Sequence, residues 1–244
     1  MIFAAGLGTR LRPLTDTMPK ALVPIGGVPL LEHVVQRLLH AGCSELVINV
    51  HHFAEQIVDY VCKRRSWGIH VTISDETDEL LDTGGGVAQA ARMTHTDEPL
   101  MIHNVDILGS LDLKAMWHFY IESDATALLA VKERETARYL LFDEKHMLRG
   151  WTNRATQQTK PAGLAIDPTW SPLAFSGIHI MGSDLLRQIA QRKGRFSIID
   201  FYLEQMAHSK IIAHPSQAPL LDVGKLNELD IAEAFICNGY APRT

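Results

Sequence analysis

Two adjoining stretches near the start of the chain decide the fold: AAGLGTRLRPLT at residues 4–15 and MPKALVPI at residues 18–25. The apolar run that leads into them, residues 1–5, predicts a buried strand. The strand breaks into a glycine-rich turn, where Gly6 and Gly8 let the backbone approach a bulky anion and point its N–H groups at it. A strand followed by such a turn indicates an anion site at the end of the strand.

Positive charge follows this turn. Arg10 and Lys20 supply two cations, and arginine can hold phosphate oxygens in a bidentate manner. Pro19 and Pro24 restrict the backbone on either side of Lys20, which lowers the entropic cost of presenting its side chain. Together these residues predict binding of a triphosphate and stabilisation of charge at a phosphorus atom.

Two better-known glycine loops do not fit this segment. The dinucleotide-binding fingerprint needs a third glycine, and Leu11 stands at that position. The P-loop ends in Gly-Lys-Ser/Thr, a tripeptide that residues 4–25 lack. A Rossmann-type dehydrogenase is therefore a distant alternative, which a lack of NAD(H) binding would exclude.

Composition narrows the class of protein. The chain has 244 residues, of which 46% are apolar and 21% charged, as in an ordinary globular α/β domain. A net charge of −5 disfavours a nucleic-acid partner or an anionic membrane surface. Neither an apolar run of about 20 residues nor a leader peptide is evident. The three cysteines, Cys43, Cys62 and Cys237, lack metal-type spacing, so we expect free thiols in a reducing cytoplasm.

Apolar runs alternate with helical patterns through the first half of the chain. Strands are expected at 1–5, 46–50, 69–74, 100–103 and 125–131, and helices at 31–39, 53–61, 84–92 and 113–120. Farther on, strands are expected at 139–142, 147–151, 175–181, 211–212 and 220–221, and helices at 184–191, 198–207 and 226–236. The alternation predicts a doubly wound, mostly parallel sheet of the α/β class.

The pattern changes between residues 139 and 172, where short strands alternate with polar turns and residues 156–159 form a polar, loop-like patch. We expect an antiparallel, lid-like insertion there, within a single domain that spans residues 1–244. The tail at 239–244 is expected to fray.

Ligands of open α/β sheets bind beyond the carboxyl ends of the strands, and two motifs fall at such ends. One is the segment from Gly6 to Lys20, and the other is Asn104-Val105-Asp106. Asp106 is a candidate Mg²⁺ ligand, because Mg²⁺ favours one or two carboxylates together with phosphate oxygens. The alternative for an isolated aspartate is a turn residue or a helix N-cap.

The run from Ala4 to Ile25 resembles the signature of the sugar-1-phosphate nucleotidyltransferases, with Gly-x-Gly-Thr-Arg-Leu-x-Pro-Leu-Thr followed by Pro-Lys-x-Leu-x-Pro. The resemblance extends to about Ile236 and implies a Rossmann-like nucleotidyltransferase fold with Mg²⁺ as cofactor. The short form and the segment Thr83–Gly86 look most like the N-acetylmuramate-1-phosphate uridylyltransferases and the mannose-1-phosphate guanylyltransferase-like proteins.

The resemblance also implies roles for individual residues. Arg10, Lys20 and Asp106 are the catalytic group, and Asp106 with Asp222 holds the metal. Contacts to the nucleotide fall to Ala5, Gly6, Gly8, Thr9, Arg10, Gly84, Gly85 and Asn104. Contacts to the sugar phosphate fall to Lys20, Asn153, Lys160 and Gly177.

Three positions depart from the family pattern. Val105 replaces the glycine of Asn-Gly-Asp, Lys225 replaces the threonine of Asp-Val-Gly-Thr-Pro, and no glutamate precedes Lys160. They leave open a catalytically silent, nucleotide-sugar-binding regulatory protein on the same fold. The preferred prediction is transfer of a nucleotide, uridylyl first, from a nucleoside triphosphate to a sugar 1-phosphate. A guanylyl- or cytidylyltransferase is the alternative, and the sequence leaves the sugar and the oligomeric state open.

Overall fold

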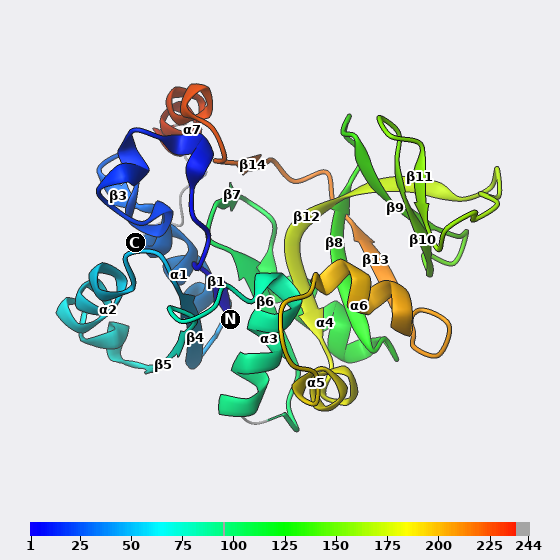
Figure 1. The fold of residues 1–244 in the computed structure, drawn as a ribbon, viewed down its shortest axis with the longest axis horizontal. Coiled ribbons are helices and arrows are strands. Elements are labelled where there is room, and N and C mark those ends of the chain that lie inside the picture. Colours follow the sequence, from blue (N-terminus) through cyan, green and yellow to red (C-terminus); the bar gives the residue numbers. More distant parts are fainter. Residues whose placement is uncertain (95, 238–244) are drawn as a thin grey trace. The chain divides into compact units, whose positions relative to one another are not determined.

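The computed structural model describes residues 1–94 and 96–237 and divides into two compact units (Figure 1). The first unit comprises residues 1–81, 103–115 and those from 218 onward, and the second comprises residues 82–102 and 116–217. The expected frayed tail, 239–244, lies outside the described residues.

The sheet of the first unit is parallel, as the sequence predicts. Its strands are β1 (Ile2–Phe3), β4 (Glu45–Val50), β5 (His70–Asp75) and the carboxyl end of β6 (Leu100–Asn104). Ile2 lies opposite Ile48 of β4 on one side and His103 of β6 on the other. The strand β1 is thus central, and its end delivers the glycine-rich turn to the carboxyl edge of the sheet.

Helices and short antiparallel pairs complete the first unit. The helices are α1 (Leu30–His40), α2 (Ala54–Lys63) and α7 (Leu229–Phe235). The antiparallel pairs are β2 (Pro24–Ile25) with β3 (Val28–Pro29), and β7 (Ile107–Gly109) with β14 (Leu220–Asp222). Leu31, Val34 and Leu38 of α1 are buried along one face, and Gly42 follows the helix with a φ of 96°, a left-handed conformation that favours glycine.

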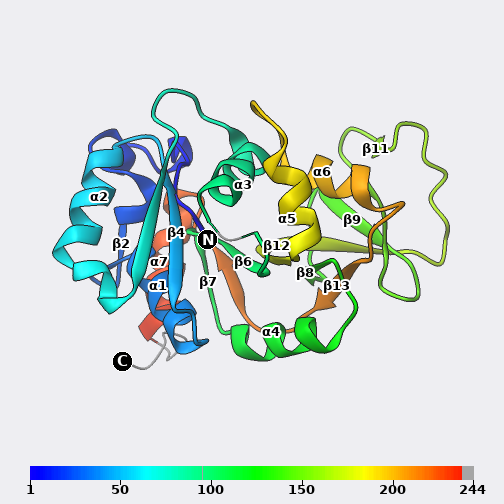
Figure 2. The same ribbon diagram turned by 90° about the horizontal axis from the view of Figure 1, so that it is seen from below.

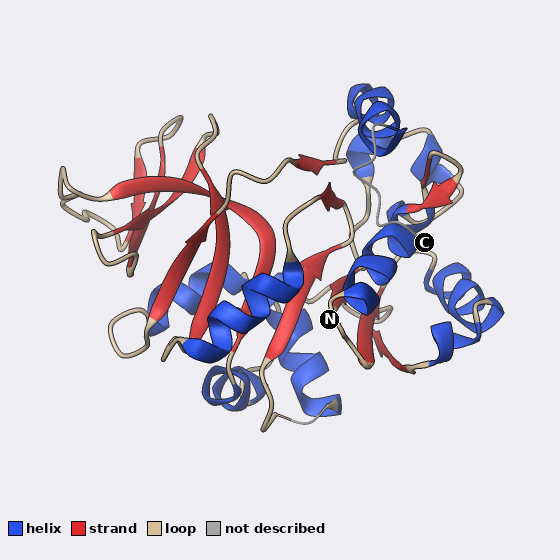
Figure 3. Ribbon diagram, turned by 180° about the vertical axis from the view of Figure 1, so that it is seen from behind, coloured by secondary structure: helices blue, strands red, loops and turns tan. Residues whose placement is uncertain are grey.

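The second unit combines parallel and antiparallel pairs, coloured red in Figure 3. Its strands are β8 (Ala127–Lys132), β9 (Arg138–Phe142), β10 (Leu148–Asn153), β11 (Gln158–Lys160), β12 (Ser171–Met181) and β13 (Ile211–Pro215). Only β8 and β13 among these run parallel to each other. Its helices are α3 (Asp82–Met93), α5 (Ser183–Ala190), α6 (Ile198–Gln205) and most of α4 (Leu113–Glu122). Helix α3 packs against α5 and α6 (Figure 2).

The antiparallel region predicted after residue 139 is present as β9, β10 and β11. One detail of the prediction is wrong: residues 156–159 are not simply a polar loop, because Gln158 already belongs to β11. Thr152 and Thr159 lie opposite each other in the β10–β11 pair. Polar side chains suit an outer strand of this kind, whose stability comes from backbone pairing and not from burial.

In the described ranges, no helix has the length and apolar character needed to cross a bilayer. The three cysteines are free thiols, as expected, with Cys62 and Cys237 exposed and Cys43 half-buried.

A buried histidine in the second unit links pH to stability. His179 of β12 is enclosed, and its Nδ1 lies 2.6 Å from the hydroxyl oxygen of Tyr202 in α6. Burial lowers the pKa of His179 to about 3, from an ordinary value of 6.5. The imidazole is therefore neutral at neutral pH, and Nδ1 accepts the hydrogen bond from the tyrosine.

We expect the free energy of unfolding to fall as the pH is lowered from 6.5 toward 3, because in that window the unfolded chain binds a proton that the folded chain excludes. The contribution of His179 is about 1 kcal/mol per pH unit. Urea unfolding at pH 7, 6 and 5 measures it. His179→Gln should flatten the pH dependence, whereas His208→Gln, at an exposed histidine, serves as the control. Equal slopes in the wild type and His179→Gln would contradict this account.

Candidate functional site

The glycine-rich turn after β1 is held in one shape by short-range contacts. Gly8 has a φ of 63°, and a Cβ there would lie 2.9 Å from Cγ2 of Thr15, so both conformation and space require glycine. The Gly8 carbonyl accepts hydrogen bonds from the backbone N–H of Leu11 (2.8 Å) and the Thr15 hydroxyl (2.9 Å). Gly6, Thr9 and Arg10 are exposed along this turn, whereas Ala5 is buried. The hydrogen bonds to the Gly8 carbonyl thus fix the shape of the turn, which exposes backbone and the Arg10 cation to solvent.

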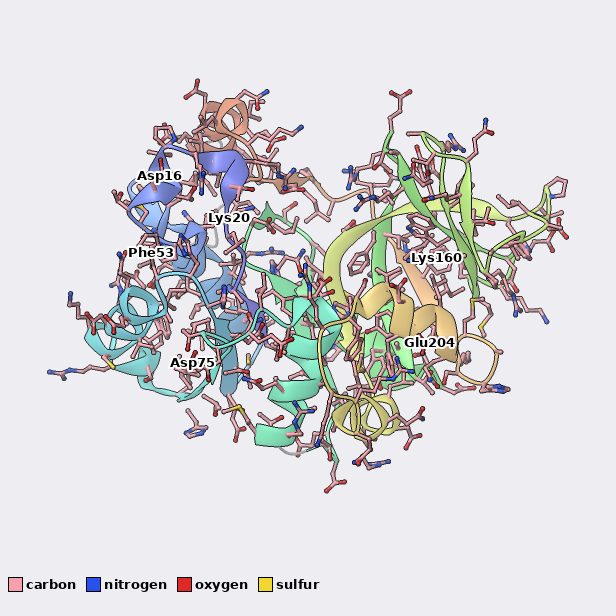
Figure 4. All side chains as sticks on the ribbon, in the orientation of Figure 1. Asp16, Lys20, Phe53, Asp75, Lys160 and Glu204 are labelled. Carbon is pink, nitrogen blue, oxygen red and sulfur yellow. The ribbon has the colours of Figure 1, made fainter. Side chains whose placement is uncertain are left out.

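Lys20 occupies a buried position in the same unit. Lys20, labelled in Figure 4, begins a short 3₁₀ turn, Lys20–Leu22, after the extended Pro19. Its side chain is 10% exposed. Its Nζ lies 2.5 Å from Oδ2 of Asp106, just past the end of β6. A buried ammonium requires such a partner, because burial removes its hydration and an opposite charge compensates for that loss. The ion pair therefore fixes the position of the ammonium.

Asp222 joins this pair through the short β7–β14 ladder. Asp222 lies opposite Ile107 in the ladder, and the N–H of Val223 donates to the backbone carbonyl of Asp106 at 2.8 Å. Desolvation of the carboxyl raises the pKa of Asp222 and the charge of Asp106 raises it further, while Lys20 and Arg10 act in the opposite direction. Two carboxylates and two cations thus influence one another electrostatically.

The guanidinium of Arg10 reaches the same place because residue 224 has no side chain. A Cβ on Gly224 would lie 2.9 Å from Nη2 of Arg10 and 3.0 Å from Oδ1 of Asp222. The N–H of Gly224 donates to Oε2 of Glu228 at 2.8 Å, which holds the segment after β14. Arg10, Lys20, Asp106 and Asp222 form a charge cluster, and the position of Arg10 in this cluster requires glycine at position 224.

A buried arginine supports the strand end that carries Asn104. Nη1 of Arg37 lies 3.1 Å from Nε2 of His103, whose Nδ1 lies 2.7 Å from the carbonyl oxygen of Asn104. Nη2 of Arg37 donates to the carbonyl of Leu111 at 2.9 Å. Burial lowers the pKa of Arg37 to about 10, which leaves it a cation at neutral pH. Nothing in the pattern of α1 singles out this arginine, so the sequence analysis missed it.

Gly84 and Gly85 lie in the first turn of α3 in the second unit. Their N–H groups donate to the carbonyl of Phe196 at 2.8 and 3.3 Å, and a Cβ on Gly84 would collide with the Phe196 ring. The absence of a side chain at Gly84 thus permits close packing of the first turn of the helix against Phe196, and the amides of both glycines already have an acceptor.

The other residues predicted for the sugar phosphate also lie in the second unit. Oδ1 of Asn153 accepts from the N–H of Ala155 at 3.0 Å, in the turn between β10 and β11. Nζ of Lys160 lies 2.5 Å from Oδ1 of Asp200 and 5.3 Å from the centre of the Trp151 ring. Gly177 has a φ of 72° where the pairing of β12 with β8 is irregular.

Within the first unit, the structure brings together the predicted residues Arg10, Lys20, Asp106 and Asp222. The sequence analysis missed two buried residues of the same unit, Asn49 and Glu76. The sequence signal that could have identified Asn49 is its position as a polar residue inside the apolar run of β4. Among the described residues, no group of three or more His, Cys, Asp or Glu side chains could hold a metal ion.

The sequence of the chain is similar to those of known nucleotidyltransferases. The sequence model of a family described as Nucleotidyl transferase matches residues 1–237. The chain is 41% identical over 241 residues to the N-acetylmuramate alpha-1-phosphate uridylyltransferase of Caulobacter vibrioides, covering 96% of this chain and 95% of that protein. It is 33% identical over 142 residues to the mannose-1-phosphate guanyltransferase of Yarrowia lipolytica, covering 57% of this chain and 39% of that protein.

A solved structure supports the fold. UDP-glucose pyrophosphorylase complexed with UDP-glucose superposes with a TM-score of 0.77 at 20% identity, covering 97% of each chain. At this identity the likeness concerns the fold alone.

We expect Gly224→Ala to displace the Arg10 guanidinium while leaving the melting temperature within about 1 °C, because the new methyl group meets the far end of a flexible side chain. Gly109→Ala is the matched contrast, because its Cβ would lie 2.5 Å from the backbone oxygen of Pro219. Overpacking against backbone should lower its melting temperature by roughly 2–10 °C. Thermal unfolding and a crystal structure of each variant decide the matter, and equal destabilisation by both would contradict the steric assignment.

Proposed function

The chain belongs to the nucleotidyl transferase family, and we propose that it transfers a nucleotidyl group from a nucleoside triphosphate to a sugar 1-phosphate with release of pyrophosphate. We propose UTP as the nucleotide, because a relative that matches 96% of this chain at 41% identity is named a uridylyltransferase. The observation that carries the proposal is the ion pair of Lys20 with Asp106, with Asp222 and Arg10 beside it.

The reaction needs no protein nucleophile. A phosphate oxygen of the sugar 1-phosphate is already an anion, and it forms the new bond to the α-phosphorus. The bond from the α-phosphorus to the oxygen that bridges it to the β-phosphorus breaks, and that oxygen leaves with its electron pair as part of pyrophosphate. What the protein contributes is orientation of the two substrates and stabilisation of negative charge at the reacting phosphorus.

In this proposal the first unit binds the triphosphate. The turn formed by Gly6, Gly8 and Thr9, in which Gly6 and Thr9 are exposed, cradles the phosphates with its N–H groups, and Arg10 holds the departing pyrophosphate. Lys20 faces the α-phosphate and offsets the charge that develops there. Ala5 and Asn104 contact the nucleoside at the ends of the two neighbouring strands.

The residues of the cluster fit a magnesium ion. Mg²⁺ usually takes one or two carboxylates and completes its coordination with phosphate oxygens and water, so a larger cluster of protein ligands is not needed. Asp106 and Asp222 are the proposed ligands, and the Lys20 ion pair engages only Oδ2 of Asp106. When bound there, Mg²⁺ would neutralise phosphate charge during the transfer.

The second unit supplies the remaining proposed contacts. Gly84 and Gly85 contact the base through atoms other than their N–H groups, which donate to Phe196. Lys160, with Asn153 and Gly177, binds the sugar phosphate, and the ammonium of Lys160 exchanges Asp200 for that phosphate. We propose that both units act as one nucleotidyltransferase domain of the cytoplasm.

Lys20→Ala is expected to lower kcat by about two to three orders of magnitude, because loss of one donor to the transition state costs roughly 3 kcal/mol. The matched control is Lys63→Ala, at an exposed lysine near the end of α2. Steady-state pyrophosphate release measures both variants, after circular dichroism has shown that each is folded. Near-normal turnover by folded Lys20→Ala would remove Lys20 from the catalytic group.

The reaction itself is tested by pyrophosphate release with Mg²⁺, crossing UTP, GTP, CTP and dTTP against a panel of sugar 1-phosphates that includes N-acetylmuramate and mannose. We expect release with UTP and one sugar. Guanylyl transfer is the second candidate, because a guanyltransferase is among the relatives at 33% identity. No release with any pair, together with tight nucleotide-sugar binding, would favour the regulatory protein instead.

A further inference from the structure

Two buried polar residues of the first unit stand apart from the charge cluster. Asn49 lies on β4 and Glu76 directly follows β5, and each is 3% exposed. A buried carboxylate is costly unless its oxygens accept hydrogen bonds. The free-energy cost of burying these two side chains must therefore be offset by the hydrogen bonds that they make.

One hydrogen bond joins the two side chains, and one further bond connects each of them to the backbone. The N–H of Ala4 donates to Oδ1 of Asn49 at 2.7 Å, and Nδ2 of Asn49 donates to Oε1 of Glu76 at 2.7 Å. The N–H of Leu81 donates to Oε2 of Glu76 at 3.1 Å. The side chains thus form one path from the end of β1, through β4, to the chain segment that follows β5.

Ala4 is the position where this path acts on the phosphate-binding turn. The strand β1 ends at Phe3, so Ala4 is the first residue outside it, and its N–H is buried. A buried N–H left without an acceptor is destabilising, so Asn49 favours one direction of the chain as it leaves the sheet. Gly6, which begins the exposed turn, is two residues farther on.

Glu76 is itself fixed by its backbone. Its N–H donates to the carbonyl of Val50 at 2.8 Å, and its carbonyl oxygen lies 2.6 Å from Nδ1 of His51. Its carboxylate is thereby held against Asn49, and it orients the amide so that Oδ1 faces Ala4. An Asn side chain without this partner could rotate its amide and turn the oxygen away from Ala4.

We infer that Asn49 and Glu76 are positioning residues for nucleoside triphosphate binding, acting through the Ala4 N–H on the turn from Gly6 to Thr9. The inference rests on the proposed function, in which that turn cradles the phosphates. Neither side chain touches substrate. The pair sets where the backbone donors of the turn stand, and it has no part in binding the second substrate.

Two isosteric variants each break this path at one point. Glu76→Gln directs an amide NH₂ at another donor, either Asn49 or the Leu81 N–H. Asn49→Asp keeps an acceptor for Ala4 but places a second carboxylate against Glu76. Each single variant should raise the KM for the nucleoside triphosphate about tenfold while changing the KM for the sugar 1-phosphate less than about twofold.

The double variant Asn49→Asp/Glu76→Gln restores all three bonds and reverses the donor and acceptor only in the bond between the two side chains. The carboxylate introduced at position 49 would accept from the Ala4 N–H and from the amide NH₂ introduced at position 76. The carbonyl oxygen of that same amide would accept from the Leu81 N–H. The double variant keeps one negative charge in the pair, as in the wild type. We expect its nucleotide KM to return to within about threefold of the wild-type value.

The experiment measures KM and kcat for both substrates in the wild type, the two single variants and the double variant. Glu45→Gln, at an exposed position on β4, is the control for loss of a carboxylate. A merely structural role would lower the fraction of active protein, and so kcat, with both KM values unchanged. That result, or a double variant no better than the singles, would overturn the inference. Absence of nucleotide turnover and binding in the wild type would instead overturn the proposed function.

Discussion

The ion pair between Nζ of Lys20 and Oδ2 of Asp106 joins two segments that are 86 residues apart in the sequence. One segment leaves the glycine-rich turn after β1, and the other leaves the end of β6, which pairs with β1. Both charges are largely withdrawn from solvent, so loss of either partner would strand the other in a poorly hydrated position. The arrangement of the carboxyl edge of this sheet depends on that pairing, because the backbone carbonyl of Asp106 also holds Val223 and thereby Asp222.

The chemistry that we propose follows from charges held in place. Two cations and two carboxylates influence one another, and the absence of a side chain at Gly224 lets the Arg10 guanidinium lie beside Asp222. A paired ammonium donates hydrogen bonds and offers no lone pair, so Lys20 acts on phosphate as a positive charge. The same unit fixes the adjoining backbone through buried polar groups: Asn49 with Glu76 at the start of the turn, and Arg37 with His103 behind Asn104. Neither pair needs to touch substrate to matter for binding.

Much of this architecture could be predicted from the sequence. The alternation of strands and helices, the parallel sheet and the antiparallel strands after residue 139 follow from periodicity and turn residues, and the structure confirms them. The strand β7 was missed because three residues, Ile107–Gly109, are too few to show a period. The convergence of Asp106 and Asp222 was implied only by resemblance to a family, since pairing of β7 with β14 is not readable from local pattern. The Asn49–Glu76 contact depends on the register of neighbouring strands, and the Phe196 carbonyl that holds the Gly84 amide comes from a distant segment. The roles assigned to the site residues stay predictions.

In the proposed function, the cluster of Arg10, Lys20, Asp106 and Asp222 promotes direct displacement at the α-phosphorus by the oxygen of the sugar phosphate, with no covalent attachment of the nucleotide to the protein. The stereochemical course at that phosphorus tests this most directly, using UTP that carries sulfur at the α-position in a single configuration. A single in-line displacement inverts the configuration in the nucleotide sugar, and the account predicts inversion. Retention would show two successive displacements through a nucleotidyl-protein intermediate and would contradict it.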